Sequence, residues 1–271
     1  MKKLLRLPSL SRVQPGSKAT LEFPLGATYE RVLFTVEAAA GLDVTDIGAI
    51  EVLFNGQGRI KFKDLQRLID LNTYYDRGAD TVTATKIEFA LHFNRGELVD
   101  NVMRSAPGIG TADLATMHIE IDIAAAAPAD IKITAAAQVN PVRQPIGAFF
   151  AVKEYPTSSN VSGAFEVDKL PRGAYYGAIH LFKADVTEVE VMANDVKIID
   201  AKKGVLERFQ KEASPVKRVP LTAKATHIDF LTDGNLLDAL PTQGLQDFRV
   251  KMQLGTSGAV DVVTETLDVL A

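Results

Sequence analysis

The chain has 271 residues, of which 46% are hydrophobic and 24% charged, with a mean hydropathy of +0.05. This composition supports large apolar cores and excludes a disordered or collagen-like chain, and the absence of cysteine excludes disulfides, thiolate metal ligands and thiol nucleophiles. The 30 Lys and Arg and 34 Asp and Glu residues leave a net charge of −4, which provides no general attraction for nucleic acid.

The first 17 residues are expected to be an N-terminal arm. They contain Lys2, Lys3, Arg6 and Arg12 and no acidic residue. Such cations favour anionic lipid headgroups by about 1 kcal/mol per charge near a membrane surface, and a solvated basic tail is an equally simple interpretation. Arginine and proline interrupt the apolar residues of the arm, so no secretion signal is predicted, and no run of about 18 apolar residues predicts a membrane span.

Alternation of apolar and polar residues predicts many short, half-buried strands. The pattern is clearest in residues 117–123, where every odd position is apolar and every even position is polar. Only residues 63–77 and 202–213 have helical periodicity, and this ratio favours sandwiches or barrels over βαβ units. The other predicted strands are residues 21–23, 31–36, 50–54, 87–93, 131–133, 178–182, 189–192, 196–199, 227–231, 248–254 and 260–269.

Five landmarks occur twice in the same order, at separations between 139 (Glu51 to Glu190) and 147 (Pro24 to Pro171). Chance can produce any one match, but the shared order and narrow range indicate two copies of one fold. Residues 141–156, with three prolines and a glycine, are predicted to join the copies. The matched pairs are Pro24–Tyr29 with Pro171–Tyr176, Asp43–Ile47 with Asp185–Val189, Glu51 and Asn55 with Glu190 and Asn194, Leu65 and Ile69 with Val205 and Phe209, and Ile87–Phe89 with Ile228–Phe230.

These patterns predict an all-β protein made of two tandem antiparallel β-sandwiches, each with a short helix. Eight strands per sandwich, arranged as a jelly roll, are compatible with the strand count but not established by it. The expected division places the arm in residues 1–17, the first jelly roll in residues 18–144 and the second in residues 145–271.

The order and spacing of these elements resemble the double jelly-roll major capsid proteins of tailless icosahedral bacteriophages with an internal membrane, of the corticovirus type. The resemblance covers nearly the whole chain and depends on structural landmarks, none of which is a catalytic motif. The landmarks are Leu21–Glu30 after the arm, the helix at Asp64–Ile69, the segment Phe89–Ile123 followed by Ala124–Pro128, the strand Ala178–Leu181, the helix at Leu206–Lys211 and the strand Leu245–Lys251.

The resemblance implies a structural protein of the virion capsid, assembled in the cytoplasm of a bacterial host, with no enzymatic activity and no required cofactor. Its implied partners are two further copies in a homotrimer, neighbouring capsomers, penton, spike and membrane proteins of the virion, and an internal lipid membrane, with no sequence-specific contact to nucleic acid. Two similar sandwiches related by roughly 60° allow a threefold trimer to imitate a hexagon, and hexagons tile without gaps. The arm is implied to point toward the membrane or to clasp a neighbouring subunit.

Residue types that carry chemistry are present but poorly arranged for it. The four histidines lie on predicted strands far apart in sequence, without the close spacing of a metal site, and His118 is interpreted as a polar position on a wet face. Ser158 and Ser159 are interpreted as linker residues and Gly108–Asp113 as a loop. The remaining histidines are His92, His180 and His227.

Three other functions remain open: a calcium site, a glycosidase and a binding protein. A structural Ca²⁺ ion is compatible with the oxygens of Asp229, Asp233 and Asn235, although an Asp-Gly-Asn sequence first indicates a tight turn. A glycosidase would need two paired carboxyl groups, for which Glu120 with Asp122 and Glu88 with Asp229 are candidates on strand faces that are usually just solvated. A receptor- or carbohydrate-binding tandem sandwich of the spike or lectin type is disfavoured by the 7% aromatic content and the absence of tryptophan.

Overall fold

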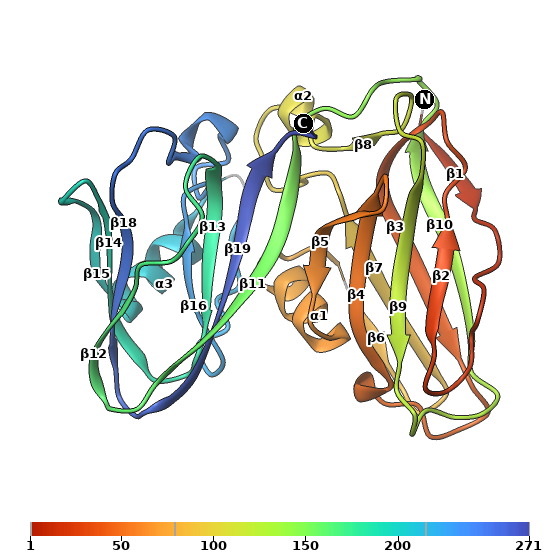
Figure 1. Ribbon diagram of the computed structural model, residues 1–271, viewed down its shortest axis with the longest axis horizontal. Coiled ribbons are helices and arrows are strands. Elements are labelled where there is room, and N and C mark those ends of the chain that lie inside the picture. Colours follow the sequence, from red (N-terminus) through yellow and green to blue (C-terminus); the bar gives the residue numbers. More distant parts are fainter. Residues whose placement is uncertain (1, 79, 215, 271) are drawn as a thin grey trace.

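Two β-sandwiches lie side by side in the computed structural model, which describes residues 2–78, 80–214 and 216–270 (Figure 1). Helix α1 (Leu65–Tyr74) lies between the sandwiches, and helix α3 (Lys203–Glu212) lies on the second one. A short helix α2 (Asn101–Ser105) lies at the same end of the molecule, the upper end in Figure 1, as the two chain ends. No helix within these described ranges is long and apolar enough to cross a bilayer.

The first sandwich consists of two antiparallel sheets. One has the strand order β1-β10-β3-β7, extended by β6 and by β8 beside β3, and the other has the order β5-β4-β9-β2. Alternation decides which side chains enter the core: β9 has the burial pattern of strictly alternating buried and half-buried residues. The strands are β1 (Lys3–Arg6), β2 (Lys18–Glu22), β3 (Thr28–Glu37), β4 (Ile47–Phe54), β5 (Gln57–Phe62), β6 (Thr81–Val82), β7 (Lys86–His92), β8 (Ile109–Gly110), β9 (Met117–Ile123) and β10 (Lys132–Asn140).

The second sandwich repeats this arrangement strand for strand. Its sheets have the orders β11-β19-β13-β16, with β17 beside β13, and β15-β14-β18-β12. Both sandwiches therefore contain eight equivalent strands in the same chain order, which confirms the predicted double jelly roll. The strands are β11 (Phe149–Ser159), β12 (Gly163–Val167), β13 (Tyr175–Phe182), β14 (Val186–Ala193), β15 (Val196–Lys202), β16 (Thr226–Asp229), β17 (Leu240–Pro241), β18 (Phe248–Leu254) and β19 (Gly258–Asp268).

The turns before β3 and β13 show the duplication at the level of single hydrogen bonds. The Tyr29 hydroxyl donates to the Pro24 carbonyl at 2.5 Å, and the Tyr176 hydroxyl donates to the Pro171 carbonyl at 2.5 Å. Both turns contain a glycine with φ near +100°, a conformation that a side chain disfavours. Two glycines in this conformation at matching positions explain why the Pro-x-Gly-Ala sequence occurs twice.

The β4–β5 and β14–β15 hairpins are duplicated in the same way. Asn55 and Asn194 have φ values of 50° and 48°, in the left-handed region that asparagine tolerates. The side-chain oxygen of each accepts two backbone N–H groups from the segment before β9 or β18. Each asparagine therefore joins its hairpin to the neighbouring strand of the same sheet.

The two helices correspond, but not in the register that the sequence suggested. Helix α1 begins at Leu65 and α3 at Lys203, each after a strand of the equivalent hairpin, so Leu71 has the same helical position as Phe209. The predicted pairing of Leu65 with Val205 was wrong by two residues. The apolar pair Val205 and Phe209 misled the alignment because it lies on the exposed side of α3, not on its core side.

All twelve predicted strands and both predicted helices overlap elements of the structure. The predicted linker at residues 141–156 was wrong in its second half, because β11 begins at Phe149 and continues through Ser158 and Ser159. The predicted loop at Gly108–Asp113 contains the short strand β8. The structure also places residues 3–6 of the expected arm in the first sandwich, as β1, the counterpart of β11.

Each sandwich has its own apolar core, and the first core extends across the junction. Its buried cluster contains Phe149, Val152 and Val263 from β11 and β19 together with the residues of the first sandwich. Phe149 meets the Phe54 ring edge to face, with centroids 5.1 Å apart. The arm contributes Leu7 and Leu10 to the same core.

Candidate functional site

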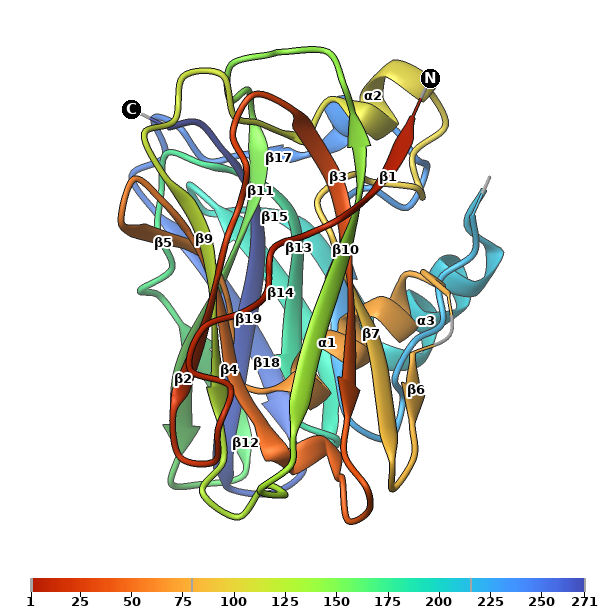
Figure 2. The same cartoon turned by 90° about the vertical axis from the view of Figure 1, so that its right-hand side faces the viewer.

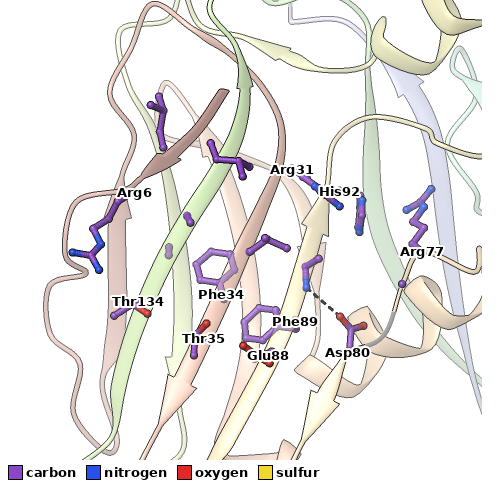
Figure 3. A pocket seen from close by; sticks show the side chains of 17 residues that line it. Arg6, Arg31, Phe34, Thr35, Arg77, Asp80, Glu88, Phe89, His92 and Thr134 are labelled. Atoms are coloured by element: carbon purple, nitrogen blue, oxygen red, sulfur yellow. Dashed lines mark hydrogen bonds between the residues drawn. The ribbon is translucent and has the colours of Figure 1, made fainter. Parts of the chain in front are cut away.

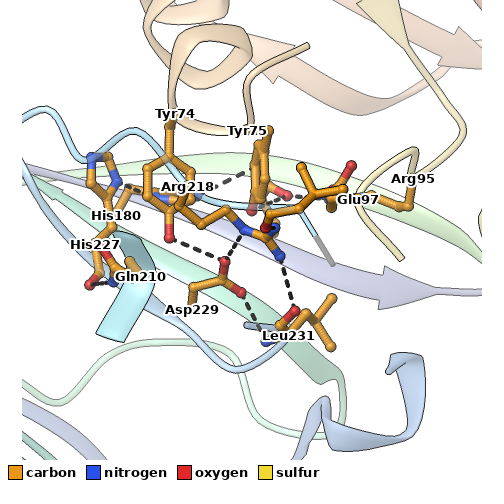
Figure 4. A network of polar contacts seen from close by, with 12 residues as sticks. Tyr74, Tyr75, Arg95, Glu97, His180, Gln210, Arg218, His227, Asp229 and Leu231 are labelled. Atoms are coloured by element: carbon orange, nitrogen blue, oxygen red, sulfur yellow. Dashed lines mark hydrogen bonds and ion pairs between the residues drawn. The ribbon is translucent and has the colours of Figure 1, made fainter. Parts of the chain in front are cut away.

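The junction between the two sandwiches contains the densest cluster of buried charged groups among the described residues (Figure 4). The end of α1 supplies Tyr74 and Tyr75, which point at the sheet β11-β19-β13-β16. At its N-terminus, Asp64 caps the helix by accepting the backbone N–H of Arg67 at 2.7 Å. The Arg67 guanidinium lies 3.3 Å from the centroid of the Phe182 ring on the opposite sandwich.

Arg218 and Asp229 form an ion pair whose side chains are both fully buried, with Nε and Oδ2 2.8 Å apart. The Tyr74 hydroxyl donates to the same carboxylate oxygen at 3.1 Å, and the Leu231 backbone N–H donates to the other oxygen at 2.8 Å. Arg218 also donates to the Leu231 carbonyl at 2.9 Å. The pair therefore links α1 of the first sandwich to β16 of the second.

His180 and His227 are cross-strand partners on β13 and β16, with their Nδ1 atoms 2.8 Å apart. His227 Nε2 accepts the Leu221 N–H at 3.3 Å, so its Nδ1 carries the proton and donates to His180. The Nε2–H of His180 then faces the Glu265 carboxylate at 3.4 Å. Burial, the neighbouring His180 and the charge of Lys203 hold the pKa of His227 well below its ordinary 6.5.

A second group of charges completes the junction on the side of the first sandwich. Arg95 pairs with Glu265 and, at 3.2 Å, with Glu97, which Arg77 contacts at 2.5 Å. The Tyr75 hydroxyl donates to Glu265 at 3.1 Å. Burial opposes ionisation of Glu97, but Arg77 and Arg95 overcome it and lower its pKa to about 2. Against the same cost of burial, Arg95 and His180 hold the pKa of Glu265 well below its ordinary value.

The buried ion pairs of the junction hold its elements together as a clamp. A void beside Leu71, Phe150 and Glu265 has a volume of about 20 Å³, enough for one water molecule, and an open hollow of about 440 Å³ adjoins the cluster at Tyr75, Arg77 and Glu97. Charged groups arranged as closed pairs fix the relative position of the elements that carry them, because any displacement would leave a buried charge unpaired. The arrangement therefore fixes the orientation of one sandwich relative to the other.

The basic residues predicted for the arm are distributed along the first sandwich. Lys2 Nζ lies 2.7 Å from the buried carboxylate of Glu30. Lys3 and Arg6 lie in β1, where all four residues are exposed. Arg12 follows the bridge at Ser11 and has a φ of 56°. The structure does not gather them into one site.

The predicted carboxylate candidates have separate surroundings. Glu120 and Asp122 both face Lys18, at 3.0 and 3.7 Å. Glu88 lies on β7 and Asp229 on β16, in different sandwiches. The strand registers make His92 the equivalent of Asp229, so the predicted match of Ile87–Phe89 with Ile228–Phe230 was wrong by four residues. No group of three metal-ligating side chains occurs among the described residues.

Sequence patterns predicted neither the ion pair of Asp229, a calcium candidate, nor the contact between two histidines. Asp229 is held by Arg218, while Asn235 caps a short 3₁₀ turn at Leu236–Asp238 by accepting the Leu237 N–H at 3.1 Å. The pairing of His180 with His227 depends on which strands become neighbours. The repeat gives no sign of it, because β3 and β7 of the first copy bear Leu33 and Ala90 at the same register position.

The outer face of the sheet β1-β10-β3-β7 is hollowed (Figure 3). The hollow has a volume of about 560 Å³ and is lined by strands and by Arg77, Gly78 and Asp80. Small side chains, Thr134 and Ala136 on β10 and Ala90 on β7, form its floor, and Leu33, 40% exposed, lies beside them. The surface of the hollow is partly apolar.

Comparison with known proteins gives consistent matches along the chain. Residues 4–140 match the family model of the viral coat protein P2 N-terminal domain, and residues 150–270 match that of its C-terminal domain. The chain is 28% identical over 284 residues to the major capsid protein P2 of Pseudoalteromonas phage PM2, covering 99% of this chain and 98% of that protein.

Solved structures of viral capsid proteins also match along the whole chain. The crystal structure of the major capsid protein P2 from bacteriophage PM2 matches with a TM-score of 0.88 and 27% identity, covering 100% of this chain and 98% of the other. A chain of the Sulfolobus Turreted Icosahedral Virus matches with a TM-score of 0.72 and 11% identity, covering 98% and 90% of the two chains. The second match shows a shared fold.

Proposed function

The chain belongs to the viral coat protein P2 family, and we infer that it is the major capsid protein of a phage virion whose working unit is a homotrimer. The observation that carries the trimer is the strand-for-strand repetition of two sandwiches held in one orientation by a buried clamp. Three such chains around a threefold axis present six similar sandwiches, and a hexagonal outline tiles a shell without gaps. Its role is then lateral contact with neighbouring capsomers.

Sedimentation of the purified full-length chain tests this function. We expect a species with three times the mass of the chain, and hexagonal arrays or closed shells in electron micrographs at higher concentration. A strictly monomeric protein that bound glycans would instead favour the receptor- or carbohydrate-binding alternative. A strictly monomeric protein without ligands would equally contradict the trimer.

We further propose that the shell surrounds a lipid membrane and that the basic segment at the start of the chain contacts it. The exposed cations of β1 and the exposed Leu4 and Leu5 beside them support this proposal, because lysine and arginine favour anionic headgroups and leucine favours the acyl boundary. Contact with a neighbouring subunit through the same segment is the competing outcome.

Neutralising Lys3 and Arg12 with glutamine is expected to weaken binding to anionic vesicles by roughly 30-fold, since each charge contributes about 1 kcal/mol near the surface. Substitution is sharper than deletion of residues 2–12, which would also remove Leu7 and Leu10 from the core. Vesicle co-sedimentation measures the effect. The matched control replaces the exposed Lys169 and Lys217 with glutamine, so its net charge equals that of the arm variant. Equal binding of the arm variant and the unmodified protein would contradict the membrane contact.

A further inference from the structure

Three polar side chains lie in a row on the outer face of the sheet β1-β10-β3-β7. The strand registers make Gln138 on β10, Arg31 on β3 and His92 on β7 direct neighbours, and these three residues are called the Arg31 row. The three strands lie side by side in Figure 2, and Figure 3 shows Arg31, His92 and Arg77 together at one end of the hollowed face. Facing residues on neighbouring strands have Cβ atoms about 5 Å apart. All three residues of the row line the open hollow of about 440 Å³.

Two nitrogen atoms of the Arg31 row have no hydrogen-bond partner within the described ranges. They are Nε of Arg31 and Nε2 of His92, and both are shielded from solvent. No carboxylate of residues 2–78, 80–214 and 216–270 forms an ion pair with the Arg31 guanidinium. Buried polar atoms are nearly always hydrogen-bonded, and an unpaired charged group is the most costly exception. The row therefore lacks an acceptor that these parts of the chain do not supply.

The carboxylates that line the hollows beside the row are engaged elsewhere or solvated. Glu97 lies 2.5 Å from Arg77 and 3.2 Å from Arg95. Asp80 accepts one side-chain and one backbone hydrogen bond, at 3.1 and 3.2 Å. Asp76 is exposed to water. The cation of the row therefore keeps a positive charge that its surroundings leave uncompensated.

The second sandwich shows how a row of charges on this face is neutralised. The matched turns before β3 and β13 and the strand registers make Glu265, Ala178 and Asp229 the equivalents of the Arg31 row. There each carboxylate is paired with an arginine from outside the sheet, Arg95 for the first and Arg218 for the second. The sign of the charge is reversed in the first sandwich. Its row is therefore expected to be neutralised by a negatively charged group.

We propose that the Arg31 row binds an oxyanion, a phosphate or carboxylate group, in this hollow. The guanidinium presents a planar set of N–H donors that matches the oxygens of both groups, and the Gln138 amide adds a neutral donor. His92 adds a charged donor when its Nε2 is protonated. The hollow has far more room than the roughly 30 Å³ of one water molecule, so a hydrated phosphate ion fits. The site depends on neither the trimer nor the membrane contact proposed above.

Free phosphate and a carboxylate side chain of a second copy are two sources of this chemistry. Isothermal titration of the full-length chain with sodium phosphate, at protein concentrations below and above self-association, distinguishes them. A free anion as the ligand should give one phosphate per chain at both concentrations. A carboxylate of another copy should compete, so that phosphate binds at the low concentration and is excluded at the high one. Absence of phosphate binding at both concentrations would overturn the site.

Substitutions in the row test which residues hold the anion. Arg31→Gln and His92→Gln should each weaken phosphate binding by at least about tenfold, as expected for the loss of one charged hydrogen bond. Arg31→Lys keeps the charge without the planar donors and should recover part of the affinity, which also covers a failure of Arg31→Gln to fold. The matched control, Arg143→Gln, removes an exposed cation outside the hollow and should bind as the unmodified protein does. Equal binding by Arg31→Gln would indicate an adventitious ion only and overturn the site.

Sulfate gives a second readout through the ring of His92. Burial and the charges of Arg77 and Arg31 lower the pKa of this ring to about 3, and a bound anion favours the protonated form, so saturating sulfate should raise this pKa. Sulfate keeps its own charge between pH 7 and 4, and the ring resonance measured by NMR reports the shift. A pKa of His92 that saturating sulfate leaves unchanged would overturn the contact. Besides Arg31, the charged groups around the ring and along the two hollows are Arg6, Asp76, Arg77, Asp80, Glu88 and Glu97.

Discussion

Replacing Arg218 with methionine is expected to lower the thermal midpoint of unfolding by about 6–20 °C. The guanidinium is the only cation within 4 Å of Asp229 among the described residues, and both side chains are fully buried. Removing it leaves a buried carboxylate with hydrogen bonds but no counter-charge, which costs about 3–5 kcal/mol. For a chain of this size each 1 kcal/mol corresponds to a shift of about 2–4 °C. Differential scanning calorimetry measures the shift.

Two further variants distinguish the effect of breaking the buried ion pair from the effect of losing any positive charge. Arg218→Met combined with Asp229→Leu removes both charges and should recover most of the midpoint, because no unpaired charge remains. Lys197→Met removes an exposed cation that pairs with Glu190 and Asp200, and it should leave the midpoint unchanged. An Arg218→Met variant as stable as the unmodified protein would show that this pair does not clamp the junction.

Lowering the pH from 7 to 4 is expected to remove about 3 kcal/mol of stability through His92 alone. Burial, helped by the charges of Arg77 and Arg31, lowers the pKa of His92 to about 3, while in the unfolded chain it is near 6.5. Between these values the unfolded chain binds a proton that the folded chain does not, so stability falls as the pH falls. At 1.36 kcal/mol per pH unit, the interval from about 6.5 to 4 gives this loss. His227, whose pKa is also lowered, adds a loss of the same sign.

Thermal midpoints measured across this pH range check the expectation. His92→Gln should flatten the profile between pH 6.5 and 4, because glutamine does not titrate. A second decline should follow below pH 4.5, where Glu97 and Glu265, with lowered pKa values in the folded chain, begin to bind protons in the unfolded chain. An identical slope in the His92→Gln variant would contradict the assignment.

The strands could be predicted because each has a wet face and a buried face, and period-two alternation records that difference locally. Two of the elements that were not predicted, β1 and β11, lack that record. β1 is exposed at all four residues, and β11 follows a proline-rich stretch and itself contains Pro156, so both resembled unstructured segments. Their equivalence in the two copies became visible only from their pairing with β10 and β19.

The helix alignment failed for a related reason. An apolar pair at helical spacing predicts a buried face, and in α1 the buried residues include Leu65, Leu68 and Leu71. In α3 the residues with this spacing are Val205 and Phe209, and both are exposed to solvent in the single chain. Periodicity reports that a face is apolar, but it does not report whether the partner belongs to the same chain or to another.

By itself, the amino-acid sequence determined the all-β class and the duplication, because alternation and turn glycines are properties of neighbouring residues and the landmarks recur in the same order. Only the tertiary structure decided that His180 meets His227, that Arg218 meets Asp229, and that one sheet face is covered while its twin is bare. These contacts join residues that are 11 to 47 positions apart on different strands and loops. Which of them become neighbours is fixed by the strand order of the assembled sheets, and no local pattern encodes that order.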